Sequence, residues 1–387
     1  MRRGARNARS VRPTRPRRRD SDGPLRYAVV GLGYIAQSAV LPAFSHAGRR
    51  CELTALVSGD AVKRRTLARK YDIDNVWSYD DFDDALDSNT FDAVYLALPN
   101  HLHRDYAVRA ARAGKHVLCE KPMALSVPDC DAMIRAANEN DVRLMVAYRL
   151  HLDPVNLHAV DTALSGRLGE IQSFVSSFGM AVKPDNIRAQ HRTGGGTLWD
   201  IGIYCINAAR YLFRDEPVEV FAWATDIGRP RFRDVEESTS CVLRFADGRL
   251  ATFWTGFTSA DIATYSLIGS KGHLRVDGAY EYHEPRQTTL TIDSKTIHRR
   301  HRMQDQFAAE LVYFADCVRR HATPVPSGLE GRADVAIIQA LYASAASGRP
   351  VRLRESAPPR RPDPRMAMSK PPVRREPSLV RAQRPHY

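Results

Sequence analysis

The segment 194–204 carries residues whose types and spacing suit proton transfer. It reads Gly-Gly-Gly-Thr-Leu-Trp-Asp-Ile-Gly-Ile-Tyr. The three glycines predict a flexible entry into a helix on which Asp200 and Tyr204, four residues apart, share one face. A carboxylate and a phenol there can bind a polyol and move a proton, but a phenol with an ordinary pKa of about 10 needs a cation beside it. The alternative makes Asp200 a charge at the helix N-terminus and Tyr204 a core aromatic.

A lysine in a second segment could supply that cation. Glu120-Lys121-Pro122 follows a strand predicted over 116–119, and open parallel sheets bind ligands at the carboxyl ends of their strands. An ammonium in a partly dry pocket can hold a substrate oxygen and lower the pKa of a neighbouring acid. Taken alone, however, a lysine is more often an exposed surface residue.

A third segment, 98–103, follows the strand predicted over 93–97 and reads Leu-Pro-Asn-His-Leu-His. It lies at the same carboxyl edge of the sheet, so we expect Pro99, Asn100 and His103 to line a nicotinamide pocket. The alternative is that His101 or His103 only caps the next helix.

A glycine-rich turn predicts a dinucleotide site. Gly31-Leu-Gly33-Tyr34-Ile35-Ala36 follows a short apolar strand and opens a helix. The first glycine permits the tight turn, the second lets the backbone approach a pyrophosphate, and the alanine keeps helix and strand close.

The end of the second strand bears on which dinucleotide is bound. It reads Val-Ser58-Gly-Asp60, followed by Lys63 and Arg64. Ser58 leaves room for a 2′-phosphate and the cations supply charge for one, so NADP is preferred. In the alternative, Asp60 binds the ribose of NAD and the cations form a solvated helix face.

The elements that must position these residues follow two patterns. Residues 24–149 alternate apolar strands with amphipathic helices, which predicts an open, doubly wound Rossmann domain. Residues 150–355 predict an α+β domain with one large, mostly antiparallel sheet and helices on one side. In the first domain the predicted strands are 27–30, 52–57, 76–77, 93–97, 116–119 and 144–147, and the helices are 36–47, 61–71, 82–86, 104–113 and 127–140. In the second the strands are 171–177, 218–225, 238–245, 250–258 and 265–268, and the helices are 154–165, 201–212, 304–320 and 331–347.

The net charge of +13 lies entirely in the two ends of the chain, because 23–355 is formally neutral. We therefore expect no nucleic-acid partner for the folded core. Residues 1–23 and 356–387 are rich in Pro and Arg and poor in apolar periodicity, which predicts disorder. A nucleic-acid binder using these basic tails is the alternative that salt-sensitive DNA affinity would reveal.

Other sequence features bear on the cellular compartment and on whether the protein binds a metal. No apolar run suggests a membrane span, and no apolar segment follows Arg2-Arg3 to make an export signal. Six scattered cysteines form no metal-ligand cluster and suit a reduced compartment. We expect a cytoplasmic protein without a metal.

Together these motifs resemble the Gfo/Idh/MocA family of oxidoreductases. The likeness spans about residues 26–352 and is strongest to the glucose-fructose oxidoreductase subgroup. The family pattern is G-x-G-x-x-(G/A), P-N-x-x-H, E-K-P and G-G-G-x-x-x-D-x-G-x-(H/Y), and all four parts occur in this chain.

The resemblance implies roles for individual residues. Lys121 and Tyr204 would be the catalytic pair, with Asp200 orienting the sugar. Lys121-Pro122 would be a cis peptide at the nicotinamide, and Ser58 and Lys63 would contact the 2′-phosphate of a tightly held NADP. The cofactor site would also include Gly31, Gly33, Tyr34, Ile35, Pro99, Asn100, His103, Glu120 and Pro122, and the sugar pocket would include Arg149, with a weaker expectation for His151.

The sequence thus predicts an NADP-dependent sugar oxidoreductase that transfers hydride between a pyranose carbinol carbon and the nicotinamide. We expect a homo-dimer or tetramer, because an exposed sheet face of this kind normally packs against a copy. The alternatives are a non-catalytic NADP-binding sensor and a dehydrogenase acting on inositol or another cyclic polyol.

Overall fold

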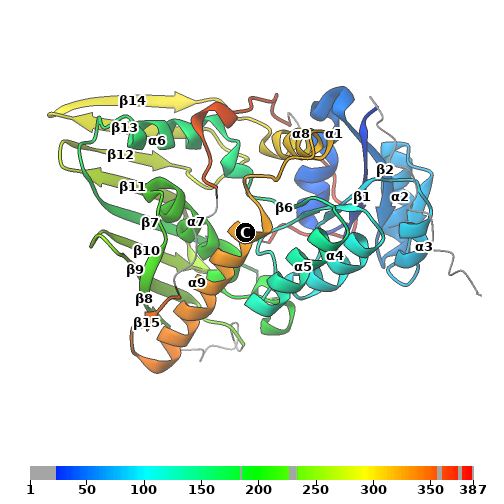
Figure 1. Ribbon diagram of the computed structural model, residues 1–387, viewed down its shortest axis with the longest axis horizontal. Coiled ribbons are helices and arrows are strands. Elements are labelled where there is room, and N and C mark those ends of the chain that lie inside the picture. The colour runs from blue at the N-terminus through cyan, green and yellow to red at the C-terminus, as the bar shows by residue number, and fades with distance from the viewer. Residues whose placement is uncertain are drawn as a thin grey trace, which may run out of the picture.

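Two sheets dominate the protein (Figure 1). The computed structural model describes residues 23–183, 185–225, 232, 234–354, 360–373 and 377–385. The predicted fold class, α/β with a doubly wound Rossmann domain and a second domain built on a large, mostly antiparallel sheet, is confirmed. Residues 1–22, which make up nearly all of the first tail predicted to be disordered, lie outside the described residues.

The first sheet is parallel, with its six strands in the order β3-β2-β1-β4-β5-β6. Its central strands are apolar and buried on both faces, as parallel strands covered by helices require. The chain order reverses between β1 and β4, which makes the crevice outside their carboxyl ends the expected ligand site. The strands are β1 (Leu25–Val30), β2 (Cys51–Val57), β3 (Asn75–Trp77), β4 (Ala93–Leu96), β5 (His116–Cys119) and β6 (Leu144–Val146).

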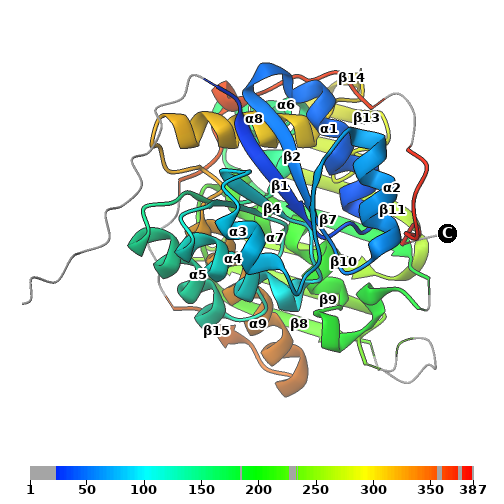
Figure 2. The same ribbon diagram turned by 90° about the vertical axis from the view of Figure 1, so that its right-hand side faces the viewer.

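Helices cover both faces of this sheet, with α1 and α2 on one side and α3, α4 and α5 on the other (Figure 2). Asp60 caps α2 through the backbone amides of Val62 and Lys63, and Ser126 caps α5, which satisfies amides that a helix start leaves without partners. The helices are α1 (Leu41–Ala47), α2 (Ala61–Tyr71), α3 (Phe82–Asp87), α4 (His103–Arg112) and α5 (Val127–Glu139), and a π-helical turn, η1 (Ala36–Val40), precedes α1.

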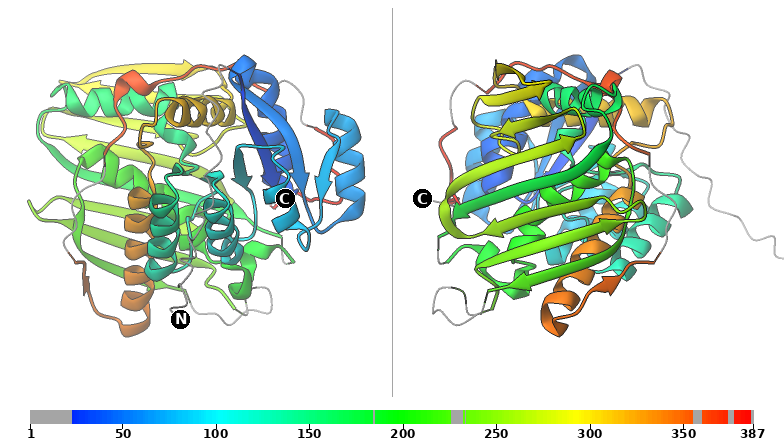
Figure 3. Two further views of the ribbon diagram at one scale, coloured as in Figure 1. Left: turned by 45° about the vertical axis from the view of Figure 1, so that its right-hand side comes forward. Right: turned by 90° about the vertical axis from the view of Figure 1, so that its left-hand side faces the viewer.

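The second sheet has nine strands in the order β14-β13-β12-β11-β7-β10-β9-β8-β15, and only the β7–β10 pair is parallel. One face packs against helices, and the other is open in the right-hand view of Figure 3. The strands are β7 (Ile171–Ala181), β8 (Pro217–Ala224), β9 (Ser238–Phe245), β10 (Leu250–Gly256), β11 (Thr258–Gly269), β12 (Gly272–Asp277), β13 (Arg286–Ile292), β14 (Lys295–His301) and β15 (Val351–Arg352). The helices are α6 (Pro154–Leu164), α7 (Ile203–Phe213), α8 (Gln306–Arg319) and α9 (Gly328–Ser347), and a π-helical turn, η7 (Leu198–Gly202), leads into α7.

The division predicted at residues 149 and 150 does not hold for α8. Although α8 follows the second sheet in sequence, its apolar side chains pack with those of α1 and β1 in one core. The hydroxyl of Tyr27 on β1 donates to the carbonyl oxygen of Leu311 on α8 at 2.9 Å. Helix α8 therefore ties the two domains together.

The prediction of disorder after residue 356 is wrong for the described residues 360–373 and 377–385, which we call the C-terminal arm. Their backbone bonds to the folded body: the amide of Met368 donates to Leu152 O and that of Asp305 donates to Lys370 O, at 2.9 and 3.1 Å. The arm also inserts Arg361 among buried carboxylates. Composition had predicted disorder because the arm has few apolar residues, but its partners lie far away in sequence.

The helices of the described residues include none that is long and apolar enough to span a membrane. The cysteines, all six of which are buried, form no disulfide.

Candidate active site

A cleft of about 940 Å³ lies at the carboxyl ends of β1, β2, β4 and β5 and is closed on its other side by the second domain. Most residues singled out from the sequence line it, although they come from six separate segments of the chain. They are Gly31, Gly33, Tyr34, Ile35, Ser58, Lys63, Pro99, Asn100, Glu120, Lys121, Arg149, Asp200 and Tyr204. A cleft of this size suits a ligand as large as a dinucleotide.

The glycine turn has the geometry that a dinucleotide needs. Gly31 has φ +94°, and a Cβ on it would lie 2.4 Å from the carbonyl oxygen of Ala97, so the turn after β1 requires glycine. A Cβ on Gly33 would meet nothing within 4 Å. That open space lies beside the start of η1, where backbone amides point toward an incoming phosphate. The residues present therefore fit a dinucleotide.

The end of β2 is arranged to accept an extra phosphate. The side chain of Ser58 is buried and lines the cleft together with Lys63. The carboxylate of Asp60 is occupied as a helix cap, accepting from Val62 N at 2.8 Å and Lys63 N at 3.1 Å. Asp60 is not among the residues that line the cleft. The acid that would bind the ribose of NAD is thus engaged elsewhere.

Lys121, two residues after β5, extends across the cleft to η7. Its Nζ donates to Asp200 O at 2.7 Å and lies 3.5 Å from Asp200 Oδ1. The same ammonium lies 4.8 Å from the centre of the Tyr204 ring. The structure therefore brings together the lysine, the carboxylate and the phenol.

Two arginines complete this group. Arg149 Nη2 donates to the hydroxyl of Tyr204 at 3.2 Å, so a second cation faces the phenol. Arg188 Nε donates to Asp200 Oδ2 at 2.6 Å. Burial would raise the pKa of Asp200, but Arg188 and Lys121 outweigh it and hold that pKa below its usual value. Asp200 is thus an anion fixed between two cations.

Arg188 was not predicted from the sequence. It lies in a stretch of short 3-10 turns, 187–189 and 191–193, without a recognisable motif. Only the folded path of the chain brings it to Asp200. The nearest signal was its position shortly before the triple glycine.

Glu120 contacts the backbone of Lys121. Its side chain is buried and accepts from the hydroxyl of Tyr95 at 2.8 Å and from the backbone amide of Lys121 at 3.2 Å. Burial raises the pKa of Glu120, and the charge of Lys121 partly opposes that change. The predicted cis peptide between Lys121 and Pro122 is confirmed.

The predicted residues His103, Pro122 and His151 are not among those that line the cleft. The ring of His103 is fully buried, with its nitrogens 2.8 and 2.9 Å from the carbonyl oxygens of Pro122 and Leu98. It holds together the loops that follow β4 and β5. Burial lowers the pKa of His103, and the two carbonyl oxygens partly oppose that change. His151 Nε2 lies 2.7 Å from Asn207 Oδ1, behind the cleft.

The fold and cleft define a protein of the dinucleotide-binding class, and comparison with known proteins gives its family. A model of the oxidoreductase family with an NAD-binding Rossmann fold, Gfo/Idh/MocA, matches residues 25–148, and a model of the Gfo/Idh/MocA C-terminal domain matches 158–275. The chain belongs to the Gfo/Idh/MocA family, as its motifs indicated. Within the described residues, no group of three or more His, Cys, Asp or Glu side chains is placed to hold a metal.

Three relatives illustrate the likeness. D-xylose 1-dehydrogenase [NADP(+)] of Haloarcula marismortui is 31% identical over 86% of this chain and 94% of its own. The solved aldose-aldose oxidoreductase of Caulobacter crescentus is 36% identical with a TM-score of 0.81, and the match covers 85% of this chain and 100% of that one. A 3-ketoreductase from Actinomadura kijaniata, solved with NADP and TDP-benzene, is 29% identical with a TM-score of 0.76, over 83% and 98% of the two chains.

Proposed function

We propose that this protein is an NADP-dependent sugar oxidoreductase that transfers hydride between a carbinol carbon of a pyranose and the nicotinamide. The observation that carries the proposal is the convergence of Lys121, Asp200 and Tyr204 on the cleft that also holds the glycine turn. The relatives named above include a xylose dehydrogenase and an aldose-aldose oxidoreductase, which supports an aldose as the substrate class.

Different residues of the cleft would bind the different parts of the cofactor. Gly31, Gly33, Tyr34 and Ile35 would hold the pyrophosphate, and Pro99, Asn100 and Glu120 would border the nicotinamide. Ser58 and Lys63 would bind the 2′-phosphate, since Asp60 caps its own helix. The nicotinamide, when bound, supplies the hydride acceptor or donor. NADP is therefore preferred over NAD.

Tyr204 is the proposed proton acceptor and donor at the sugar hydroxyl. Arg149 Nη2 donates to its hydroxyl at 3.2 Å, and Lys121 Nζ lies 4.8 Å from the centre of its ring. As the sugar is oxidised, its hydroxyl proton would pass to Tyr204 Oη, and the reverse would hold on reduction. Asp200, pinned by Arg188, would keep Lys121 in place and accept a hydrogen bond from the sugar.

The test is a screen of sugars with the purified protein. Aldoses and inositols are added to the protein with NADP or NAD, and formation of reduced nicotinamide is followed by absorbance. We expect an aldose to reduce NADP and expect Lys121→Ala to abolish that signal while still binding NADPH by fluorescence titration. Binding of NADPH without reduction by any sugar would favour the sensor, and a response only to inositols would favour the cyclic polyol dehydrogenase.

We also propose a homo-oligomer, dimer or tetramer, formed through the open face of the nine-stranded sheet. Large apolar side chains are exposed on its strands, among them Val175, Trp223, Leu250, Ile268 and Ile297. Such a patch on a sheet face is typical of an interface. Light scattering of the eluted protein tests the oligomeric state, and a monomer mass would rule out the homo-oligomer.

The free cysteines support a cytoplasmic, reducing location.

A further inference from the structure

The C-terminal arm follows a path that leads it to the cofactor end of the cleft. Arg361 anchors its first part between Glu216 and Glu330, with Arg361 Nη2 also donating to Asp215 O at 3.0 Å. The arm then passes over α6 and the start of α8, and Val373 is among the residues that line the cleft. Figure 2 shows the last part of the arm beside α2, at the end of the chain.

The arm next pairs with the helix that begins after the glycine turn. Val380 N donates to Gln37 Oε1 at 2.7 Å, and Gln37 Nε2 donates back to Val380 O at 2.9 Å. The same Nε2 donates to Leu32 O, inside the glycine turn, at 2.9 Å. The amide of Gln37 is buried. One side chain therefore links the arm directly to the turn that holds a pyrophosphate.

Two arginines follow this anchor. Arg381 Nη1 lies 3.4 Å from Oδ2 of Asp60, two residues after Ser58. Arg384 and Pro385 line the cleft itself. Arg381 thus lies beside the segment that carries Ser58 and Lys63, and Arg384 lines the same cleft as those two residues. A phosphate-bearing dinucleotide is the ligand that this charge suits.

The end of the arm reaches the second domain. The backbone amide of Lys183, two residues after β7, donates to Pro385 O at 2.9 Å. The segment 380–385 thus runs from Gln37 and Asp60 on the Rossmann domain to Lys183 on the other side of the cleft. Ser38 and Ser58, which lie close to the Rossmann anchors in sequence, line the cleft, as do Arg384 and Pro385 of the segment itself. A dinucleotide in the cleft would therefore lie against this segment.

We propose that residues 380–385 form a clasp over the dinucleotide, with Arg381 and Arg384 as additional phosphate-binding residues, so that the clasp sets the rate at which the cofactor leaves. This inference rests on the proposed function only in taking NADP as the ligand. The three relatives match 94 to 100% of their own length but only 83 to 86% of this chain. Between 14% and 17% of this chain, 100% less the 86% and 83% covered, thus lies outside these matches.

The test compares release of NADPH from the full-length protein and from Arg381→Ala/Arg384→Ala. The protein is loaded with NADPH and mixed with excess NADP, and the loss of bound NADPH fluorescence is timed. Losing charge-assisted bonds to phosphate should speed release by about tenfold or more. Because the Arg381 side chain is 62% exposed and its pair with Asp60 is solvated, we expect little change in thermal stability.

Three controls separate a clasp from a general disturbance. Arg365→Ala removes an exposed arginine of the same arm whose only ion-pair partner among the described residues is Asp363, and it should release NADPH at the unchanged rate. Arg381→Lys/Arg384→Lys should restore slow release, because the charge remains. Release from the unaltered protein should accelerate with salt, and that dependence should weaken in the alanine variant.

The outcomes distinguish the clasp from the proposed function. Unchanged release from the alanine variant would overturn the clasp while leaving sugar oxidation standing. Faster release without any sugar-dependent reduction would support the clasp and overturn the function. A full-length protein that binds no NADPH would overturn both.

Discussion

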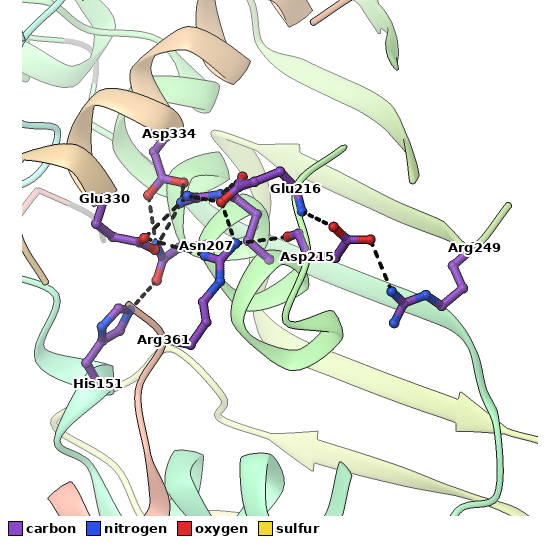
Figure 4. Close-up of polar contacts among 9 residues, drawn as sticks. His151, Asn207, Asp215, Glu216, Arg249, Glu330, Asp334 and Arg361 are labelled. Atoms are coloured by element: carbon purple, nitrogen blue, oxygen red, sulfur yellow. Dashed lines mark hydrogen bonds and ion pairs between the residues drawn. The ribbon is translucent and has the colours of Figure 1, made fainter. Parts of the chain in front are cut away.

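Helix α7 and the turn before it serve two clusters of buried charge that differ in what they can do. Asp200 and Tyr204 at its start join Lys121, Arg149 and Arg188 in the cleft. One to two turns further on, Asn207 and Arg210 join a network with Glu216, Glu330 and Asp334, which Arg361 of the C-terminal arm completes (Figure 4).

The two clusters differ in access rather than in charge. Arg210 is 0% exposed and its guanidinium is paired on three sides by carboxylates, so no face is left for a ligand. In the cleft cluster, Lys121 and Tyr204 border open space. Buried charge is therefore found in both structural and candidate catalytic groups. Access to the cleft is the feature that distinguishes the two kinds of group.

Removing the central cation of the network should give the largest effect. Arg210→Met leaves Glu330 and Asp334 buried without their main partner, which typically costs about 3 to 5 kcal/mol of folding free energy. We expect this loss in the free energy of unfolding measured with urea, with turnover per folded molecule unchanged at low temperature. Arg244→Met, which breaks an exposed pair with Glu219, should cost under about 1 kcal/mol. An equal effect from the two variants would show that the buried network stabilises the fold no more than an exposed pair does.

Removing the phenol hydroxyl of the cleft cluster should lower turnover and leave stability almost unchanged, which is the reverse of the effect expected for Arg210→Met. Tyr204→Phe keeps the ring that packs near Phe178 and Tyr280 but removes the proposed proton acceptor. Turnover with the best sugar should fall by about a thousandfold, as expected for loss of a general acid–base, while NADPH affinity and the melting temperature change little. Full turnover in this variant would exclude Tyr204 from proton transfer.

Much of this comparison could be predicted from the sequence, because both the strands and the site motifs are local signals. The strand His116–Cys119 and the helix Ala61–Tyr71 have the predicted bounds. Lys121 and Tyr204 come from motifs at strand and helix ends, where parallel-sheet topology fixes their position.

The rest depended on contacts between distant segments. β12, β13 and β14 were not predicted, because strands such as Lys295–His301 are mostly polar and exposed and show no apolar alternation. Arg188 and Arg361 each find their carboxylates only after folding. A composition rich in Pro and Arg predicts disorder when such partners are not considered, and that is why the arm and its contact with Gln37 were missed.

A buried acid outside both clusters, Glu310, gives a further prediction, and we expect its effect on stability to be smaller than that of Arg210. Glu310 on α8 is fully buried, and within the described part of the chain neither of its carboxyl oxygens has a hydrogen-bond partner. Burial raises its pKa well above the usual value, and the nearby charge of Glu120 adds to that, while Arg149 opposes it. Unlike Glu330, whose pairs with two arginines hold it in the network, Glu310 is a buried acid best kept protonated.

This contrast predicts how stability depends on pH. A carboxyl whose folded-state pKa is raised favours folding fully below its unfolded pKa of about 4.3, and that contribution is lost as pH rises through the folded value. Glu310→Gln mimics the protonated form, so it should raise the melting temperature at pH 8, by about 2 °C or more, and have less effect at pH 5. The exposed Glu139→Gln should shift both temperatures equally. A gain from Glu310→Gln that is the same at both pH values would show that Glu310 is not the titrating group.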